Sequence, residues 1–111
     1  MNRKEELQWA LIKEAKKLLM IWAENNNINI YDIHFVPMGD FRLEVYIFYE
    51  KNDDIKKNQL SGQTEQVKAI FLEKLSKLDY KKHFDKGVSF IFDSNENVVE
   101  NYEGSYFLRL R

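Results

Sequence analysis

Residues 28–49 have the sequence INIYDIHFVPMGDFRLEVYIFY, and this stretch decides the predicted fold. Along residues 41–49 the side chains alternate between an apolar set and a mixed set, which is typical of a strand with one face on a core. The apolar set is Phe41, Leu43, Val45, Ile47 and Tyr49. Residues 37–40 (Pro-Met-Gly-Asp) have the composition of a tight turn. The stretch therefore predicts a hairpin of two strands, 28–37 and 41–49.

An amphipathic helix precedes this hairpin. Over residues 3–24, apolar side chains recur at helical spacing. The stripe consists of Leu7, Leu11, Ala15, Leu18 and Trp22, widened by Ile12 and Leu19. Three asparagines at 25–27 then predict the helix end, because asparagine tolerates the left-handed conformation of a helix exit.

A second helix and a second hairpin are predicted after the first. Residues 51–63 are polar and predict a loop, with at most one helical turn. Residues 64–79 carry an apolar face at helical spacing, and 88–93 predict a third strand. The polar residues 94–97 predict a turn, so 98–102 are expected to return as a fourth strand. Residues 105–111 alternate again and could extend the sheet.

The predicted order is α-β-β-α-β-β, within a single α+β domain over residues 1–111. A chain of 111 residues fits one domain, because smaller pieces bury too little surface. We expect an antiparallel sheet of four or five strands with both helices packed on one face. The predicted core contains Trp22, Leu18, Val45, Ile47, Ile70, Phe71, Phe90 and Phe92.

The sequence offers no recognisable set of catalytic or metal-binding residues. It has no cysteine, and its two histidines, His34 and His83, are far apart without metal-ligand spacing. The adjacent carboxylate pair Asp53-Asp54 is typical of a helix start or a solvated loop. With four glycines, no phosphate-binding loop is present. We therefore predict no enzyme activity, cofactor or metal, and we expect the chain to bind another macromolecule.

Charge is distributed unevenly along the chain, although the net charge is only −1. Residues 32–54 hold six acids against two basic residues, and residues 85–103 hold five acids against one lysine. Acidic hairpins suit a basic protein partner. They also suit charges on strand edges that discourage aggregation, and charge alone favours neither interpretation.

The predicted partner-binding surface combines the acids of both hairpins with two tyrosines as aromatic anchors. Glu44, Tyr46 and Glu50 share the strand face opposite the aliphatic side chains, so we expect that face to meet solvent. Acids around a tyrosine can combine fast association with a desolvated contact. The candidate residues are Asp40, Glu44, Tyr46, Glu50, Asp53, Asp54, Asp93, Glu96, Glu100, Tyr102 and Glu103.

The C-terminal stretch VSFIFDSNENVVENYEGSYFLRLR, residues 88–111, carries a family resemblance. It combines a hydrophobic strand, Phe-Asp-Ser, a polar turn and a return strand ending in Asn-Tyr-Glu. At Asp93, Ser94, Tyr102 and Glu103 it resembles the YezG-like immunity proteins of bacterial polymorphic toxin systems. More loosely, it resembles immunity proteins of contact-dependent growth inhibition. The resemblance implies a cytoplasmic antidote that binds and blocks a cognate toxin domain, such as a nuclease, without enzymatic activity.

Two other functions stay open. Residues 56–84 hold seven lysines against three acids, so a nucleic-acid-binding module could use the Lys-rich second helix. A small enzyme or ligand-binding domain could have its pocket between the sheet and the helices. The N-terminal residues mix charges into their apolar positions, which predicts neither a signal peptide nor a membrane span.

Overall fold

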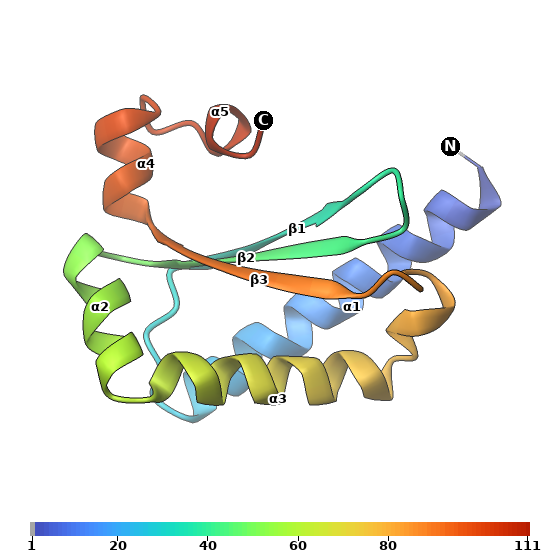
Figure 1. The fold of residues 1–111 in the computed structure, drawn as a ribbon, viewed down its shortest axis with the longest axis horizontal. Helices are drawn as coiled ribbons and strands as arrows, with labels where there is room; N and C mark the ends of the chain where they lie inside the picture. Colours follow the sequence, from blue (N-terminus) through green and yellow to red (C-terminus); the bar gives the residue numbers. More distant parts are fainter. Residues whose placement is uncertain (1) are drawn as a thin grey trace.

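The computed structural model describes residues 2–111 (Figure 1). A three-stranded sheet separates two layers of helices. Helices α1 and α3 cover one face, and the C-terminal helices α4 and α5 lie on the other (Figure 1). In chain order the elements are α1 (Arg3–Asn25), β1 (Asp32–Pro37), β2 (Leu43–Tyr49), α2 (Asn52–Leu60), α3 (Gln63–Lys77), the short 3₁₀ helix η1 (Tyr80–Lys82), β3 (Val88–Ser94), α4 (Asn95–Asn101) and α5 (Tyr106–Arg109).

The sheet is mixed, with strand order β1-β2-β3. Strand β1 pairs antiparallel with β2 across the predicted hairpin, whereas β3 pairs parallel with β2. The prediction of an antiparallel sheet of four or five strands is therefore wrong. The physical reason is the connection between β2 and β3. Helices α2 and α3 return the chain to the side of the sheet where β2 began, so β3 runs in the same direction.

The predicted fourth strand at 98–102 and the predicted strand at 105–111 are both helical. Ser94 ends β3 and caps α4, because its hydroxyl oxygen accepts a hydrogen bond from the Asn97 amide at 3.0 Å. Ser105 caps α5 in the same way, through the Leu108 amide at 3.2 Å. Each serine satisfies an amide that a helix start leaves free, and this outweighs the β preference of the valines in α4.

The predicted loop at 51–63 contains helix α2. The Asp54 carboxylate accepts a hydrogen bond from the Lys51 amide at 3.1 Å, so the Asp53-Asp54 pair marks a helix start. Gly62 separates α2 from α3 with a backbone φ of +84°, a conformation that glycine adopts without strain. The polar loop was a wrong prediction, but the helix start at the two aspartates agrees with the interpretation of that pair.

The core lies between α1, α3 and the inner face of the sheet. Val45, Ile47 and Phe71 are fully buried, and Trp22, Phe90 and Phe92 pack against them while half-buried. Leu18 and Ile70, also predicted to lie in the core, are only half-buried. The reason for Leu18 is that α1 faces the sheet along a stripe of four-residue steps, which leaves Leu18 at its side. This stripe consists of Leu11, Ala15, Leu19 and Ala23.

Within residues 2–111, every helix is too short or too polar to cross a membrane.

Candidate partner-binding surface

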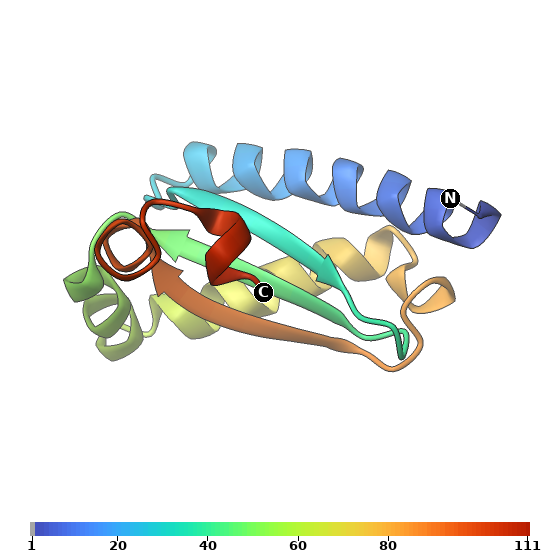
Figure 2. The ribbon, with the colours of Figure 1, turned by 90° about the horizontal axis from the view of Figure 1, so that it is seen from above.

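Residues 95–111, which we call the C-terminal cap, lie across the outer face of the sheet near the ends of β2 and β3 (Figure 2). An ion pair holds the cap to the sheet. The Arg109 Nε donates to Asp93 Oδ2, and the Asn97 amide group donates to both Asp93 carboxylate oxygens at 3.1 Å. Burial opposes the charge on Arg109, but the hydrogen bond and the charge of Asp93, together with Tyr102 and Tyr46, raise the arginine pKa overall. The cap is thus tied to the end of β3.

Tyr106 provides a second anchor for the cap. Its ring stacks on His34 at 4.7 Å between centroids and meets Phe48 edge-on at 4.8 Å. Its hydroxyl donates to Asn95 Oδ1 at 2.7 Å, which links α5 back to α4. Burial, reinforced by nearby negative charge, raises the pKa of Tyr106 to about 12. Because of this cover, Phe48 is fully buried although it points to the outer face, where we had expected solvent.

The cap is also joined to the start of α2. The Asn52 amide donates to Glu96 Oε1 at 2.9 Å, so the Glu96 carboxylate serves the N-terminus of α2. The Ser94 hydroxyl bonds to the side-chain oxygen of Asn52. These contacts bring the acidic start of α2 next to the acidic cap. We call this combined region, residues 50–54 and 95–111, the acidic end of the molecule.

Large apolar side chains are exposed on the cap. Val99 on α4 is 58% exposed and Phe107 on α5 is 75% exposed. Glu100 and Glu103 are exposed beside them in the sequence. Exposed apolar groups with carboxylates around them are a common composition of protein interfaces. Sequence reasoning missed Val99 and Phe107 because it placed both segments in strands. The serine caps at 94 and 105 were the signal that could have revealed two helices.

The structure brings most of the predicted interface residues to the acidic end and separates the others. Those at the acidic end are Glu50, Asp53, Asp54, Glu96, Glu100, Tyr102 and Glu103. Tyr46 is half-buried on the outer face, with the Arg109 guanidinium 5.4 Å from its ring centre. The Tyr46 hydroxyl donates to Glu44 at 3.4 Å, nearer the start of β2.

Two further predicted interface residues are not available to a partner at the acidic end. Asp40 lies in the β1–β2 turn and pairs with Arg42 at 3.1 Å. Asp93 is only 7% exposed and is bonded to Arg109, so a partner could contact its carboxylate only by displacing the cap. Its role in this structure is to hold the cap on the sheet.

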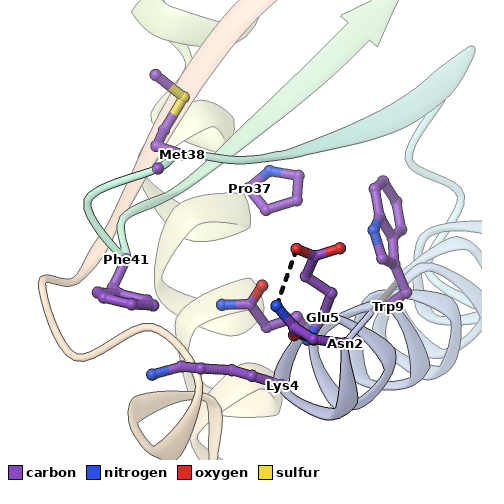
Figure 3. Close-up of a pocket in the computed structure, with 9 residues that line it drawn as sticks. Asn2, Lys4, Glu5, Trp9, Pro37, Met38 and Phe41 are labelled. Atoms are coloured by element: carbon purple, nitrogen blue, oxygen red, sulfur yellow. Dashed lines mark hydrogen bonds between the residues drawn. The ribbon is translucent and has the colours of Figure 1, made fainter.

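An open groove of about 510 Å³ lies at the opposite end, between the start of α1 and the β1–β2 turn (Figure 3). Trp9 and Phe41 are its exposed aromatic residues. Asn2 donates to the Glu5 carboxylate at 3.2 Å, and the Lys4 ammonium lies 3.8 Å from the centre of the Phe41 ring. The charged groups of Glu5 and Lys4 thus already interact with other residues that line the groove. The groove is a surface hollow, not a pocket between the sheet and the helices.

The lysines considered for nucleic-acid binding are Lys74, Lys77, Lys81 and Lys82. Lys77 pairs with Glu73 at 3.2 Å, and Lys82 pairs with Asp79 at 3.1 Å. These carboxylates reduce the positive charge that this side presents to a phosphate backbone. Among residues 2–111, no three His, Asp or Glu side chains lie close enough together to hold a metal ion.

His34 lies beneath Tyr106 on the outer face. Its Nε2 is 3.1 Å from Asp32 Oδ2, and the same aspartate pairs with Lys16 at 3.2 Å. Burial lowers the pKa of His34, and the Asp32 carboxylate only partly offsets that effect. The folded chain therefore favours the neutral imidazole that stacks on Tyr106.

This lowered pKa predicts a pH dependence of stability. The unfolded chain takes up a proton at His34 near pH 6.5, whereas the folded chain resists it until a lower pH. Stability from this site is complete above about pH 6.5 and is lost as the pH falls below it. We expect His34→Gln to flatten the fall in unfolding free energy between about pH 7 and pH 5, measured by urea titration. His83→Gln is the control, and an equal flattening in both variants would contradict the assignment to His34.

No family model, curated protein or solved structure matches this chain. Its function is therefore inferred from its residues and their geometry.

Proposed function

We propose that the chain is an immunity protein that binds a cognate bacterial toxin domain in the cytoplasm of the producing cell and neutralises it. The observation that carries this proposal is the exposure of Val99 and Phe107 on an anchored cap whose acids Glu100 and Glu103 are also exposed. The proposed role requires binding alone and no catalysis.

The apolar side chains of the cap would provide the affinity. Removing an exposed Phe or Val side chain from water on binding is worth roughly 1.5–3 kcal/mol, and such contacts are strongest at the centre of an interface. The cap is already ordered by the Asp93–Arg109 pair and by Tyr106, so little conformational entropy remains to be lost on binding.

The carboxylates of the acidic end would speed association with the toxin and select a basic partner surface. Glu50, Asp53, Glu100 and Glu103 are exposed at this end. A toxin that cleaves nucleic acid has a basic cleft, and carboxylates can occupy sites built for phosphates. Opposite charge also accelerates encounter, which matters when a toxin must be captured before it acts. We therefore favour a basic toxin surface, such as a nuclease cleft, as the partner.

The proposal predicts that a toxin domain is encoded beside this chain, and the test uses that domain. Co-expression should restore growth, and purified components should form a complex measurable by titration calorimetry. We expect Phe107→Ala and Val99→Ala each to weaken binding by roughly tenfold or more. Leu60→Ala is the control, because Leu60 is 79% exposed on α2 and lies outside the cap. Its affinity should stay within about twofold of the parent chain.

Reversing the charge of an exposed acid tests whether that acid speeds association or forms a contact in the complex. Glu100→Lys and Glu103→Lys should slow association and reduce its salt dependence more than they change dissociation. The proposed surface is wrong if the cap variants bind the toxin and protect cells normally, while variants of Lys77 and Lys81, in the Lys-rich region, lose protection. A toxin with an acidic surface would then be indicated.

A further inference from the structure

Strand β3 forms an edge of the sheet. Figure 2 shows β2 on one side of β3 and no strand along its other side. The Leu43 amide donates to the Gly87 carbonyl at 3.0 Å, which fixes the direction of the backbone groups that follow. Because these groups alternate along a strand, Ser89, Ile91 and Asp93 face β2. The amides and carbonyls of Val88, Phe90 and Phe92 therefore face the open edge.

This edge lacks the usual protection against pairing. Its sequence, VSFIFDS, has no lysine and no proline. Its single charge, on Asp93, is bonded to Arg109 in the cap. Exposed strand edges of this composition readily pair with another strand.

Residues 65–72 of α3 lie beside the same edge. Between it and β3 is an open hollow of about 530 Å³, lined in part by Leu72 and Phe90. Leu72 is 39% exposed. Glu65, Lys68, Ala69 and Leu72 follow one another at spacings that place them on one side of the helix. The Lys68 ammonium and the Glu65 carboxylate are 3.5 Å apart, so this side is close to neutral.

We propose that a second copy of the chain pairs with β3 in antiparallel orientation and forms a continuous six-stranded sheet. The outward backbone groups at positions 88, 90 and 92 are symmetric about Phe90. With the two-fold axis at Phe90, Val88 of each copy pairs with Phe92 of the second copy. Strand β3 of one copy can therefore pair in register with β3 of the other copy.

The side chains around the edge also suit a second copy. Two-fold pairing brings residues 65–72 of both α3 helices toward each other, and it covers Leu72 and Phe90 on each copy. Glu65 and Lys68 give each helix one charge of each sign, so the copies meet without a like-charge excess. This inference does not use the proposed toxin, and it can fail or hold independently of the proposed function.

Hydrogen exchange followed by NMR tests the pairing directly. The amides of Ser89, Ile91 and Asp93 bond to β2 and serve as internal controls, because they should be protected at every concentration. The amides of Val88, Phe90 and Phe92 should exchange rapidly in dilute protein and become protected as the concentration rises. Sedimentation equilibrium should show a monomer–dimer transition over the same concentrations.

A variant distinguishes this edge from other contacts. Leu72→Lys adds like charges across the proposed axis and should raise the dimer dissociation constant by about tenfold or more. Ile21→Lys is the control, because Ile21 is 47% exposed on α1, at the other edge of the sheet. Three results would overturn the proposal: a monomer at millimolar concentration, a dimer unchanged by Leu72→Lys, or protection of the edge amides only when the toxin is added. The last would assign the edge to the toxin.

Discussion

Replacing Phe71 by alanine is expected to lower the free energy of unfolding by about 3–5 kcal/mol. Phe71 is fully buried in the layer between α1, α3 and the sheet. Its ring meets Trp22 edge-on at 6.0 Å and lies 6.4 Å from Phe90. These rings come from three different elements, so they cannot all close the space that the alanine leaves. Urea unfolding followed by tryptophan fluorescence measures the loss.

The control for this variant is Leu60→Ala, which shortens an apolar side chain that is 79% exposed. It should change the unfolding free energy by less than about 0.5 kcal/mol. A loss below about 1 kcal/mol for Phe71→Ala would mean that α3 presents a different face to the sheet.

Replacing Asp93 by alanine is expected to destabilise the chain by about 1.5–3 kcal/mol, because it removes the charged acceptor of a partly buried ion pair. The Arg109 side chain is only 21% exposed and would lose its carboxylate. The Asn97 amide group would lose its acceptor at the same time. We expect the cap to detach locally, with faster hydrogen exchange in α5 than in α3.

Asp85→Ala is the control, since Asp85 is exposed in the connection before β3. A double variant, Asp93→Ala with Arg109→Ala, should recover part of the loss because no unpaired charge remains buried. If the double variant is less stable than the sum of the two single variants, the ion pair does not hold the cap in the way described.

The sequence could predict the elements whose contacts are local. Helix α1 was expected at 3–24 and lies at 3–25, because its periodic stripe and the asparagines after it are visible within one segment. Alternation in 41–49 correctly assigned the buried face of β2, since Leu43, Val45 and Ile47 are all fully buried. The third strand, expected at 88–93, lies at 88–94.

The errors concern elements that depend on distant partners. The direction of β3 follows from the crossover through α2 and α3, and that connection was interpreted as a loop and one helix. The cap helices start at serine caps, and distant contacts hold them on the sheet: Ser94 bonds to Asn52 and Asp93 bonds to Arg109, across 42 and 16 residues of sequence. Residues 98–102 alone, Val-Val-Glu-Asn-Tyr, favour a strand. The local signal against this preference lies just outside the segment, in the capping serines Ser94 and Ser105.

The sequence could predict which acids belong to the candidate surface, but not how the structure arranges them. Sequence reasoning selected the acids that the structure gathers at the acidic end. It also selected Asp93, which is internal, because a carboxylate in a presumed hairpin has no visible partner in the sequence. Val99 and Phe107 were missed because their exposure depends on the helices of the cap.

The most direct test is an NMR map of the labelled chain during titration with the toxin domain that the proposal expects beside it. The account predicts that the largest chemical-shift changes occur at Val99, Tyr102 and Phe107, with smaller changes at Glu50 and Asp53. Resonances of the groove at Trp9 and Phe41 should stay unchanged. If the largest changes instead fall on that groove or on the lysines of α3, the C-terminal cap is not the toxin-binding surface.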